Sequence, residues 1–291
     1  MATNNACLVY DARLVIDANF HTNDPAIRAA GPATKLQRIY YNDRWRHELA
    51  NSREIGSLLG QQMLNMFDPS QPPLLKPPKD DCHLLPQFEE PKVVSALLPG
   101  DCQYLFVSKP ALKELKEEMN NERNGVRILS TGGENMDKPY FSLHIDKYNK
   151  VQTIICLSKK PFPASNYIHL YGVHERLLNK LIDRYDEGLI SDFYSFLDDV
   201  WPLAIYHDRF AEFQSEIREI LQSIPPKGQQ SIADKVREML EGTGEIKPSE
   251  LEQLKAVYLK DGYKRAVEER LLNFISFNYN LLPMYAKPDL V

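Results

Sequence analysis

The hydrophobic period of this chain changes at the Pro-Phe-Pro sequence of residues 161–163 and stays changed from there on. In the stretch before that point, most apolar residues occur in short runs, the clearest of them with a spacing of two, which is the period of a β-strand. After it, they recur about every 3.6 residues, which is the period of an amphipathic helix. Strands in one part of the chain and helices in the other predict an α+β fold.

The clearest predicted hairpin joins residues 140–145 to residues 151–157 through the turn sequence DKYNK. A loop this short joins antiparallel strands, because a parallel connection needs a crossover of a dozen or more residues. Phe141, Leu143 and Ile145 alternate with polar residues, so we expect them to face the helices of the C-terminal half. Ser142 should then face solvent and tolerate replacement by Asp.

Three more apolar runs extend this hairpin into a mainly antiparallel sheet, at residues 93–98, 104–107 and 126–129. A charge-rich helix is expected between them, at residues 111–121. The helical half should contain helices over residues 173–185, 210–221 and 232–240. A final helix should start at a capping box formed by Ser249 and Glu252, run to Tyr279 and be interrupted near residues 261–262.

The first part of the chain shows weaker signals. Runs at residues 7–10 and 13–17 predict a hairpin, and a third run, residues 26–30, predicts a strand that Gly31 and Pro32 end. Asn51 and Glu54 have the spacing of a capping box, so a helix should follow them. Prolines are concentrated between residues 69 and 91, a composition typical of a stiff linker.

These features together predict four segments. We expect residues 1–68 to be the end of a dinucleotide-binding-like domain and residues 69–91 to be the linker. Residues 92–224 should form an α+β domain, and residues 229–291 a helical tail. No internal repeat is present.

Composition excludes several classes of function. The sequence has 35 Lys and Arg against 40 Asp and Glu, a net charge of −5, which disfavours a nucleic-acid partner. No apolar stretch is long enough to span a membrane, and the first residues lack a leader pattern, so we expect a cytoplasmic protein.

The four cysteines are too scattered for a disulfide framework, and His169 and His174 have the wrong spacing for two metal ligands on one helix face. We expect no metal and no catalytic residue.

Residues 10–32 resemble the closing segment of the flavin domain in two-dinucleotide-domain oxidoreductases. In that family a hairpin leads to a Thr, then an aliphatic strand, then Ala-x-Gly-Asp, and Thr22 and Gly31 fall at matching positions. The family's Asp accepts hydrogen bonds from the flavin ribityl chain, whereas this chain has Pro32, which has no acceptor side chain and no N–H. The thirteen glycines also never take the G-x-G-x-x-G spacing of a pyrophosphate-binding turn. We therefore treat Thr22, Gly31 and Pro32 as vestigial positions and expect no cofactor.

A second resemblance covers almost the whole chain, from about Cys7 to Val291. The sequence resembles the C-terminal part of the family of cilia- and flagella-associated protein 61. The strings that carry the resemblance are RLVIDANFHTNDPAIRAAGP at residues 13–32, IDKYN at 145–149, PFPASNYI at 161–168, HDRF at 207–210 and LPMYAKP at 282–288. Family members are considerably longer, so the chain is expected to be a fragment or a short isoform.

This resemblance implies a non-enzymatic scaffold of the ciliary and flagellar axoneme, required for motility, including that of sperm. It implies a place in the calmodulin- and spoke-associated complex at the radial-spoke base, with other axonemal proteins and calmodulin as partners. Residues 92–224 are expected to resemble the dimerisation domain that follows the flavin domain in oxidoreductases, and whether the chain self-associates is left open by the sequence. The alternative is part of a flavin- or NAD(P)-dependent oxidoreductase that lacks its N-terminal cofactor-binding half. Pro32 and the absence of a glycine-rich turn favour the scaffold.

Overall fold

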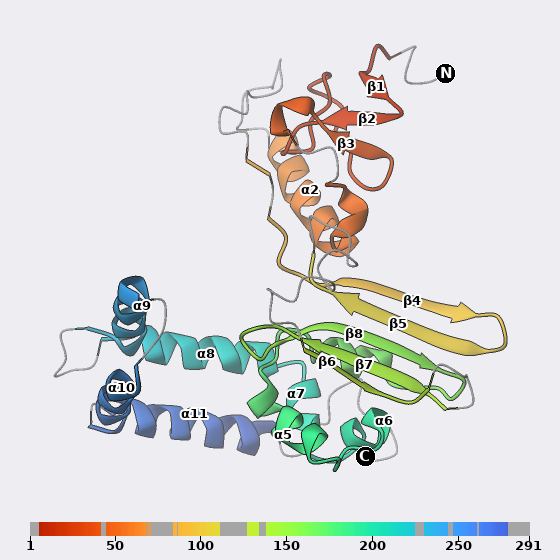
Figure 1. Ribbon diagram of the computed structural model, residues 1–291. Coiled ribbons are helices and arrows are strands. Elements are labelled where there is room, and N and C mark those ends of the chain that lie inside the picture. The colour runs from red at the N-terminus through yellow and green to blue at the C-terminus, as the bar shows by residue number, and fades with distance from the viewer. Residues whose placement is uncertain are drawn as a thin grey trace. The chain divides into compact units, whose positions relative to one another are not determined.

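The computed structural model describes residues 6–41, 45–68, 70, 84–85, 87–110, 127–133, 138–224, 230–243, 247–260 and 262–278. The chain divides into two compact units, Met1–Leu197 and Asp198–Val291, which are described separately below (Figure 1). Most of the expected linker and the whole of the helix expected at residues 111–121 lie outside the described residues. The division into four segments remains a prediction.

The first unit begins with a small three-stranded sheet in the order β1-β2-β3, with β1 at Tyr10–Asp11, β2 at Arg13–Ile16 and β3 at Thr34–Leu36. Strands β1 and β2 form the expected hairpin around Ala12, whose φ of 57° allows the tight reversal. Strand β3 pairs with β2 in parallel, Leu14 opposite Thr34.

The strand expected at residues 26–30 is wrong. That segment forms an isolated bridge between Arg28 and His21 instead of a ladder. Its backbone bonds run from the Ala29 N–H to the Phe20 carbonyl, and between Ile27 and residues 22 and 24 of the same loop. The third strand lies beyond Gly31, which has a φ of 93° and starts the turn into β3. Gly31 and Pro32 therefore introduce a strand instead of ending one, because the turn that they form brings β3 alongside β2.

Helix α2, Ser52–Phe67, is capped by Asn51, whose side chain accepts a hydrogen bond from the Arg53 N–H at 2.9 Å. The other half of the expected capping box is wrong, because Glu54 does not bond back to the cap. Its carboxylate accepts hydrogen bonds from the backbone N–H groups of Glu89 and Glu90. The chain that leads to the large sheet is thus held against the start of α2.

The core of this N-terminal part combines α2 with the small sheet and two short 3-10 helices, η1 (Arg38–Tyr40) and η2 (His47–Leu49). Its buried apolar residues are Ile16, Phe20, Leu36, Tyr40, Trp45, Ala50 and Ile55. Leu85 and Phe88, from the end of the proline-rich segment, pack against this core.

A five-stranded sheet follows, in the order β4-β5-β8-β7-β6 (Figure 1). Its strands are β4 (Lys92–Leu98), β5 (Cys102–Ser108), β6 (Arg127–Thr131), β7 (Tyr140–Ile145) and β8 (Val151–Ser158). Every neighbouring pair is antiparallel. The predicted mainly antiparallel sheet and the hairpin at its centre are therefore confirmed.

One face of this sheet is covered by α4 (Ala164–Ile168), α5 (Leu181–Asp186) and α6 (Phe193–Leu197). Phe141, Leu143 and Ile145 are fully buried. The Phe141 ring meets the rings of Tyr167 and Phe193, with centroids 5.2 and 5.6 Å away. These contacts confirm which face of β7 packs against helices.

The expectation for Ser142 is wrong, because Ser142 is also fully buried although it lies on the opposite face of β7. His144, two residues further along the same face, is 3% exposed. Ser142 lies between Ser130 of β6 and Ile155 of β8 on this face, so side chains of both neighbouring strands flank its small hydroxymethyl group.

The continuous helix expected over residues 173–185 is also wrong. A 3-10 turn, η4 (Glu175–Leu177), is separated from α5 by Asn179 and Lys180, which both have positive φ angles. Leu178 and Leu181 are nevertheless fully buried, so the apolar stripe fills the core through a broken backbone path.

The second unit is helical, with α7 (Leu203–Tyr206), α8 (Phe210–Gln222), α9 (Ile232–Thr243), α10 (Pro248–Lys260) and α11 (Tyr263–Asn278). Helices α8 and α11 pack together, and the Tyr263 hydroxyl donates to the Ser223 carbonyl at 2.7 Å. The expected break near residues 261–262 is confirmed. The expected Ser249 cap is wrong, since α10 begins at Pro248 and Glu250 accepts from the Lys247 N–H at 2.8 Å.

Candidate functional site

Thr22, the first vestigial position, has a structural role in its own loop. Its side chain is buried, and its Oγ1 donates to the Ile27 and Asp24 carbonyls at 2.8 and 3.0 Å. The Thr22 N–H also bonds to the Ile27 carbonyl, so this residue closes the loop between β2 and the Gly31 turn.

Gly31 is bonded to a residue that the sequence motif did not suggest, His47 of η2. The Gly31 N–H donates to His47 Nδ1 at 3.0 Å, and the Thr34 hydroxyl lies 3.2 Å from the same nitrogen while donating to the Gly31 carbonyl. Burial lowers the pKa of His47 to about 4, so the ring is a neutral acceptor at pH 7. No pattern in the sequence pairs His47 with Gly31, because the contact depends on how η2 folds back.

A cavity of about 390 Å³ lies beside this turn, lined by Gly31, Pro32 and His47 and by Asn51 and Ser52 at the start of α2. Three groups there that could meet an anionic ligand are not available. The Gly31 N–H is bonded to His47, the Arg53 N–H at the helix start is bonded to Asn51, and Pro32 has no N–H. The geometry thus favours a structural role for this turn.

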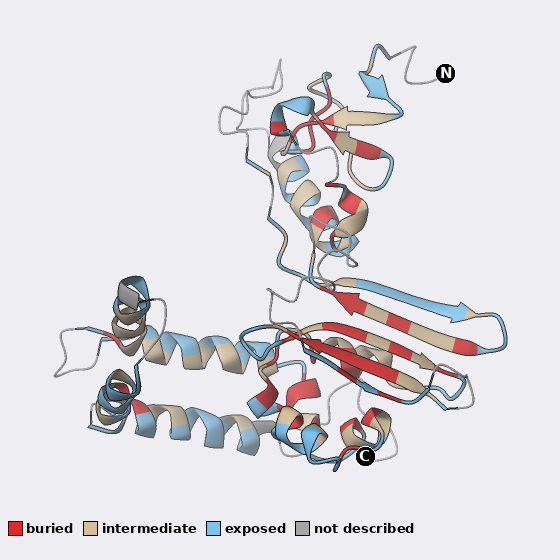
Figure 2. Cartoon of the chain, viewed as in Figure 1, coloured by how far each residue is buried: buried red, intermediate tan, exposed pale blue. Residues whose placement is uncertain are grey.

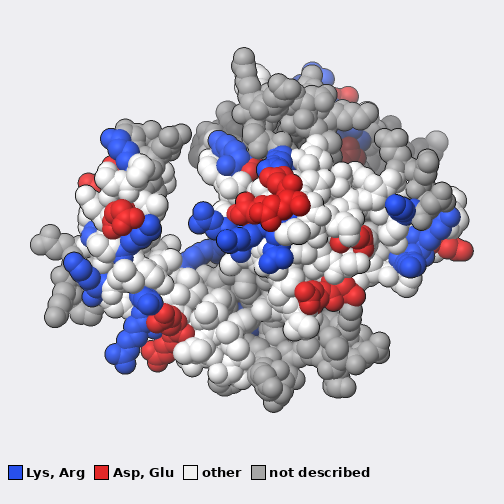
Figure 3. All heavy atoms as spheres, turned by 60° about the horizontal axis from the view of Figure 1, so that its bottom comes forward, with Lys and Arg blue, Asp and Glu red and all other residues white. Residues whose placement is uncertain are grey.

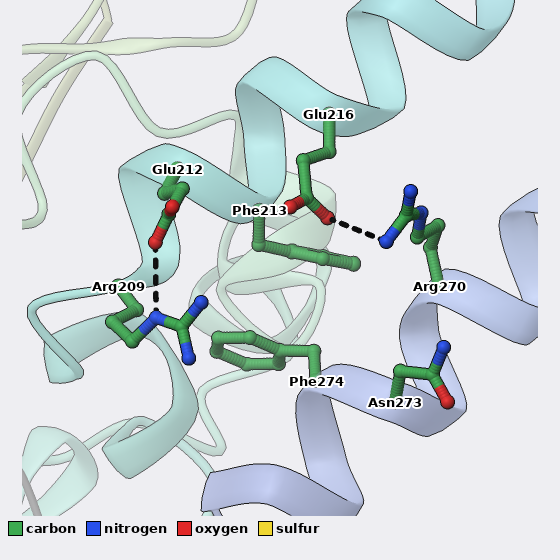
Figure 4. Close-up of a pocket in the computed structure, with 7 residues that line it drawn as sticks. All are labelled: Arg209, Glu212, Phe213, Glu216, Arg270, Asn273 and Phe274. Carbon is green, nitrogen blue, oxygen red and sulfur yellow. Dashed lines mark hydrogen bonds and ion pairs between the residues drawn. The ribbon is translucent and has the colours of Figure 1, made fainter.

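A second cavity, of about 330 Å³, lies between α8 and α11 (Figure 4). The Phe213 and Phe274 rings stack with centroids 4.7 Å apart. Two ion pairs flank the rings, Arg209 to Glu212 at 2.9 Å on one side and Arg270 to Glu216 at 3.8 Å on the other. Each of these two arginines is paired with its own glutamate, so the charges that line the cavity are balanced. The stacked rings and the two ion pairs hold α8 against α11.

The two outer strands of the large sheet differ in cover. The side chains of β4 are exposed along most of the strand, whereas those of the adjoining β5 are largely buried or half-buried (Figure 2). The other outer strand, β6, is held by α5, because the Tyr185 hydroxyl donates to the Ser130 carbonyl and accepts from the Ser130 N–H. The edge of β4 is the more accessible of the two.

The two histidines weighed as metal ligands have structural roles, and two cysteines of the described residues, Cys102 and Cys156, are buried. His174 caps η4 by accepting from the Arg176 N–H, and His169 Nδ1 lies 2.9 Å from the Ser165 carbonyl. Cys156 is buried, which raises the pKa of its thiol. Within the described ranges, no group of three or more His, Cys, Asp or Glu side chains could hold a metal ion.

On the face shown in Figure 3, charged side chains of both signs lie beside one another among the described residues. A face of mixed charge does not attract a polyanion over long range. Among the described helices, none is long and apolar enough to cross a bilayer.

Comparison with known proteins identifies the region around the large sheet. Residues 86–205 match a family profile described as the CFAP61 dimerisation domain. Cilia- and flagella-associated protein 61 of Tetrahymena thermophila is 28% identical over 291 residues, covering 97% of this chain and 16% of the relative. This chain therefore spans about one sixth of the length of that relative.

Two solved structures show weaker likeness. The crystal structure of Fdr9 aligns with a TM-score of 0.28 and 14% identity, over 52% of this chain and 32% of that chain. The covalent putidaredoxin reductase–putidaredoxin complex aligns with a TM-score of 0.31 and 16% identity, over 64% and 38% of the two chains.

The antiparallel sheet and the helices on one of its faces give the first unit an α+β fold. In sequence, the chain is similar to cilia- and flagella-associated protein 61 along 97% of its length, and residues 86–205 match the profile of the dimerisation domain described for that protein.

Proposed function

We propose that this chain is a non-enzymatic scaffold of the ciliary and flagellar axoneme, required for motility. We place it in the calmodulin- and spoke-associated complex at the radial-spoke base, with other axonemal proteins and calmodulin as partners. We also propose that it self-associates through the domain at residues 86–205. The observation that carries the proposal is the similarity to cilia- and flagella-associated protein 61 over 97% of the chain.

The geometry at the vestigial flavin positions supports a role without chemistry. The Gly31 N–H and the Arg53 N–H at the start of α2 are bonded within the protein, and Pro32 replaces the carboxylate that would accept from a ribityl chain. The described surface supplies contact area instead, with Leu251, Leu271, Leu272 and Ile275 of α10 and α11 between 42% and 63% exposed. Exposed apolar residues on two neighbouring helices suit a protein partner.

The alternative function, part of a flavin- or NAD(P)-dependent oxidoreductase, has a direct test. The full-length protein is purified after flavin supplementation, and its visible absorbance is compared with that of a Pro32→Asp variant, which restores the acceptor. We expect no bound flavin in the unaltered protein. Stoichiometric, saturable flavin retention by the unaltered protein would overturn the non-enzymatic assignment.

The axonemal assignment is tested in ciliated cells that lack the endogenous protein. Cells receive either the full-length protein or the same protein without residues 86–205. The amount of the protein in isolated axonemes and the beat frequency of the cilia are then measured. We expect the full-length protein to restore both, and the deletion to restore neither. Restored beating without any axonemal incorporation of the protein would contradict a scaffold role.

A further inference from the structure

Strand β4 is a long, regular and apolar outer strand. Apart from Lys92 and Ser95, all of its seven residues are apolar, and all seven pair in unbroken register with β5. Its exposed side chains include Val93, Val94 and Leu97, at 37%, 38% and 69% exposure, so side chains on both faces of the strand reach solvent. At the start of the strand, Lys92 and Val93 also line the cavity beside Gly31. An outer strand without a bulge, an internal charge or a proline can accept another strand.

The outward-facing backbone of β4 adds to this accessibility. In an antiparallel pair, alternate residues direct their N–H and C=O groups away from the partner, so about three or four residues of β4 present them to the free edge. Among the described residues, β4 pairs with no strand other than β5. At the opposite end of the sheet, by contrast, Tyr185 already bonds both the N–H and the C=O of Ser130.

We propose that β4 pairs antiparallel with β4 of a second copy of this chain, centred on Ser95, to give a ten-stranded sheet across two subunits. This inference rests on the self-association proposed above and assigns it to one edge. The profile match to a dimerisation domain spans β4, and a second copy is the occupant that such a domain implies. A twofold axis at Ser95 makes the contact self-complementary, as a closed dimer requires.

The register around Ser95 has favourable side-chain pairs. Val93 of one copy lies opposite Leu97 of the other, and Val94 lies opposite Ala96. The only charged residue of the strand, Lys92, falls opposite Leu98 at the end of the contact, so no like charges meet. Apolar cross-strand pairs of this kind stabilise a sheet, whereas like charges placed opposite each other destabilise it.

This register also fixes how the two sheets join. In this register each odd-numbered residue lies opposite an odd-numbered residue of the other copy, and each even-numbered residue opposite an even-numbered one. The same face of both strands therefore points to the same side of the joint sheet. A twofold axis perpendicular to the sheet thus keeps the helix-covered faces of both copies on one side. Because one strand pair forms a small interface, the association should be weak and depend on protein concentration.

The test uses Ser95, the one residue that would lie opposite itself. The unaltered chain, Ser95→Lys and Ser95→Glu are each studied by analytical ultracentrifugation over a concentration series, and the two variants are then mixed. We expect each variant alone to dimerise about twofold to fivefold more weakly, and the mixture to form heterodimers at least as tight as the unaltered dimer. Ser95 is exposed, so both substitutions should leave the melting temperature unchanged.

Ser130→Lys is the matched control, since Ser130 is exposed on the other outer strand and should not change the dimer constant. If Ser95→Lys lowers the melting temperature, Ser95→Cys replaces it, in a background with Cys7 and Cys82 changed to Ser. Mild oxidation should then join two chains, and failure to cross-link would overturn the pairing.

If Ser95→Lys and Ser95→Glu leave the dimerisation constant unchanged, the β4 pairing is overturned and self-association is left intact. A chain that stays monomeric at all concentrations would overturn both, without bearing on axonemal incorporation.

Discussion

Replacing Ser142 by Asp tests the burial of the second face of β7. Ser142 is 0% exposed, and its hydroxyl has no hydrogen-bond partner among the described residues. Ser130, directly opposite it on β6, is exposed and provides a matched control for the same substitution. We expect Ser142→Asp to destabilise the first unit strongly and Ser130→Asp to change its stability by about 0.5 kcal/mol or less.

The size of the effect follows from the cost of protonating the new carboxyl group. An aspartate with an unfolded pKa of about 3.9 must bind a proton to be neutral in a fully buried site, which costs about 4 kcal/mol at pH 7. Domains of ordinary stability unfold with about 5–15 kcal/mol, so Ser142→Asp should remove much of that margin. Ser142→Ala should be neutral or stabilising by up to about 1 kcal/mol, because it removes an unbonded buried hydroxyl.

Urea denaturation followed by circular dichroism measures these free energies of unfolding at pH 7 and at pH 4.5, with Ser142→Asn as the uncharged isostere. In Ser142→Asp the folded pKa lies above the unfolded pKa, so stability relative to Ser142→Asn should fall as pH rises through about 4 and beyond. Equal effects of Asp at positions 142 and 130 would refute the reasoning. So would a Ser142→Asp penalty that stays the same at both pH values.

Three further predictions concern single contacts of the first unit. Burial lowers the pKa of His47 from 6.5 to about 4, so stability should fall as pH drops through that interval, and His47→Asn should flatten the slope in denaturation curves. Tyr185→Phe should cost about 1–2 kcal/mol and speed hydrogen exchange at the Ser130 amide, because one hydroxyl bonds both backbone groups. Asn51→Ala should cost about 1–2 kcal/mol in thermal melting through loss of the α2 cap and of the bond from the Asn51 amide to the Pro91 carbonyl, and Ser52→Ala should cost less.

The sequence predicted best the elements that local interactions determine. The β7–β8 hairpin follows from alternating apolar residues around a short turn, in which the Asp146 side chain accepts from the Tyr148 and Lys150 N–H groups. Helix α8 follows from an apolar stripe, and the α2 start follows from an Asn that can reach a first-turn N–H. These signals lie within a few residues of the structures that they specify.

The sequence did not determine features that depend on distant neighbours. Ser142 is flanked on its face by side chains of β6 and β8, and only the order of the whole sheet decides that these strands are its neighbours. Gly31 and Pro32 start β3 because β2 offers a parallel partner, and His47 accepts from Gly31 because η2 folds back over that turn. A residue pattern records which side chains alternate along a strand. Whether that strand lies inside a sheet or at its exposed edge depends on pairing with strands elsewhere in the chain, and for β4 only the tertiary structure decided it.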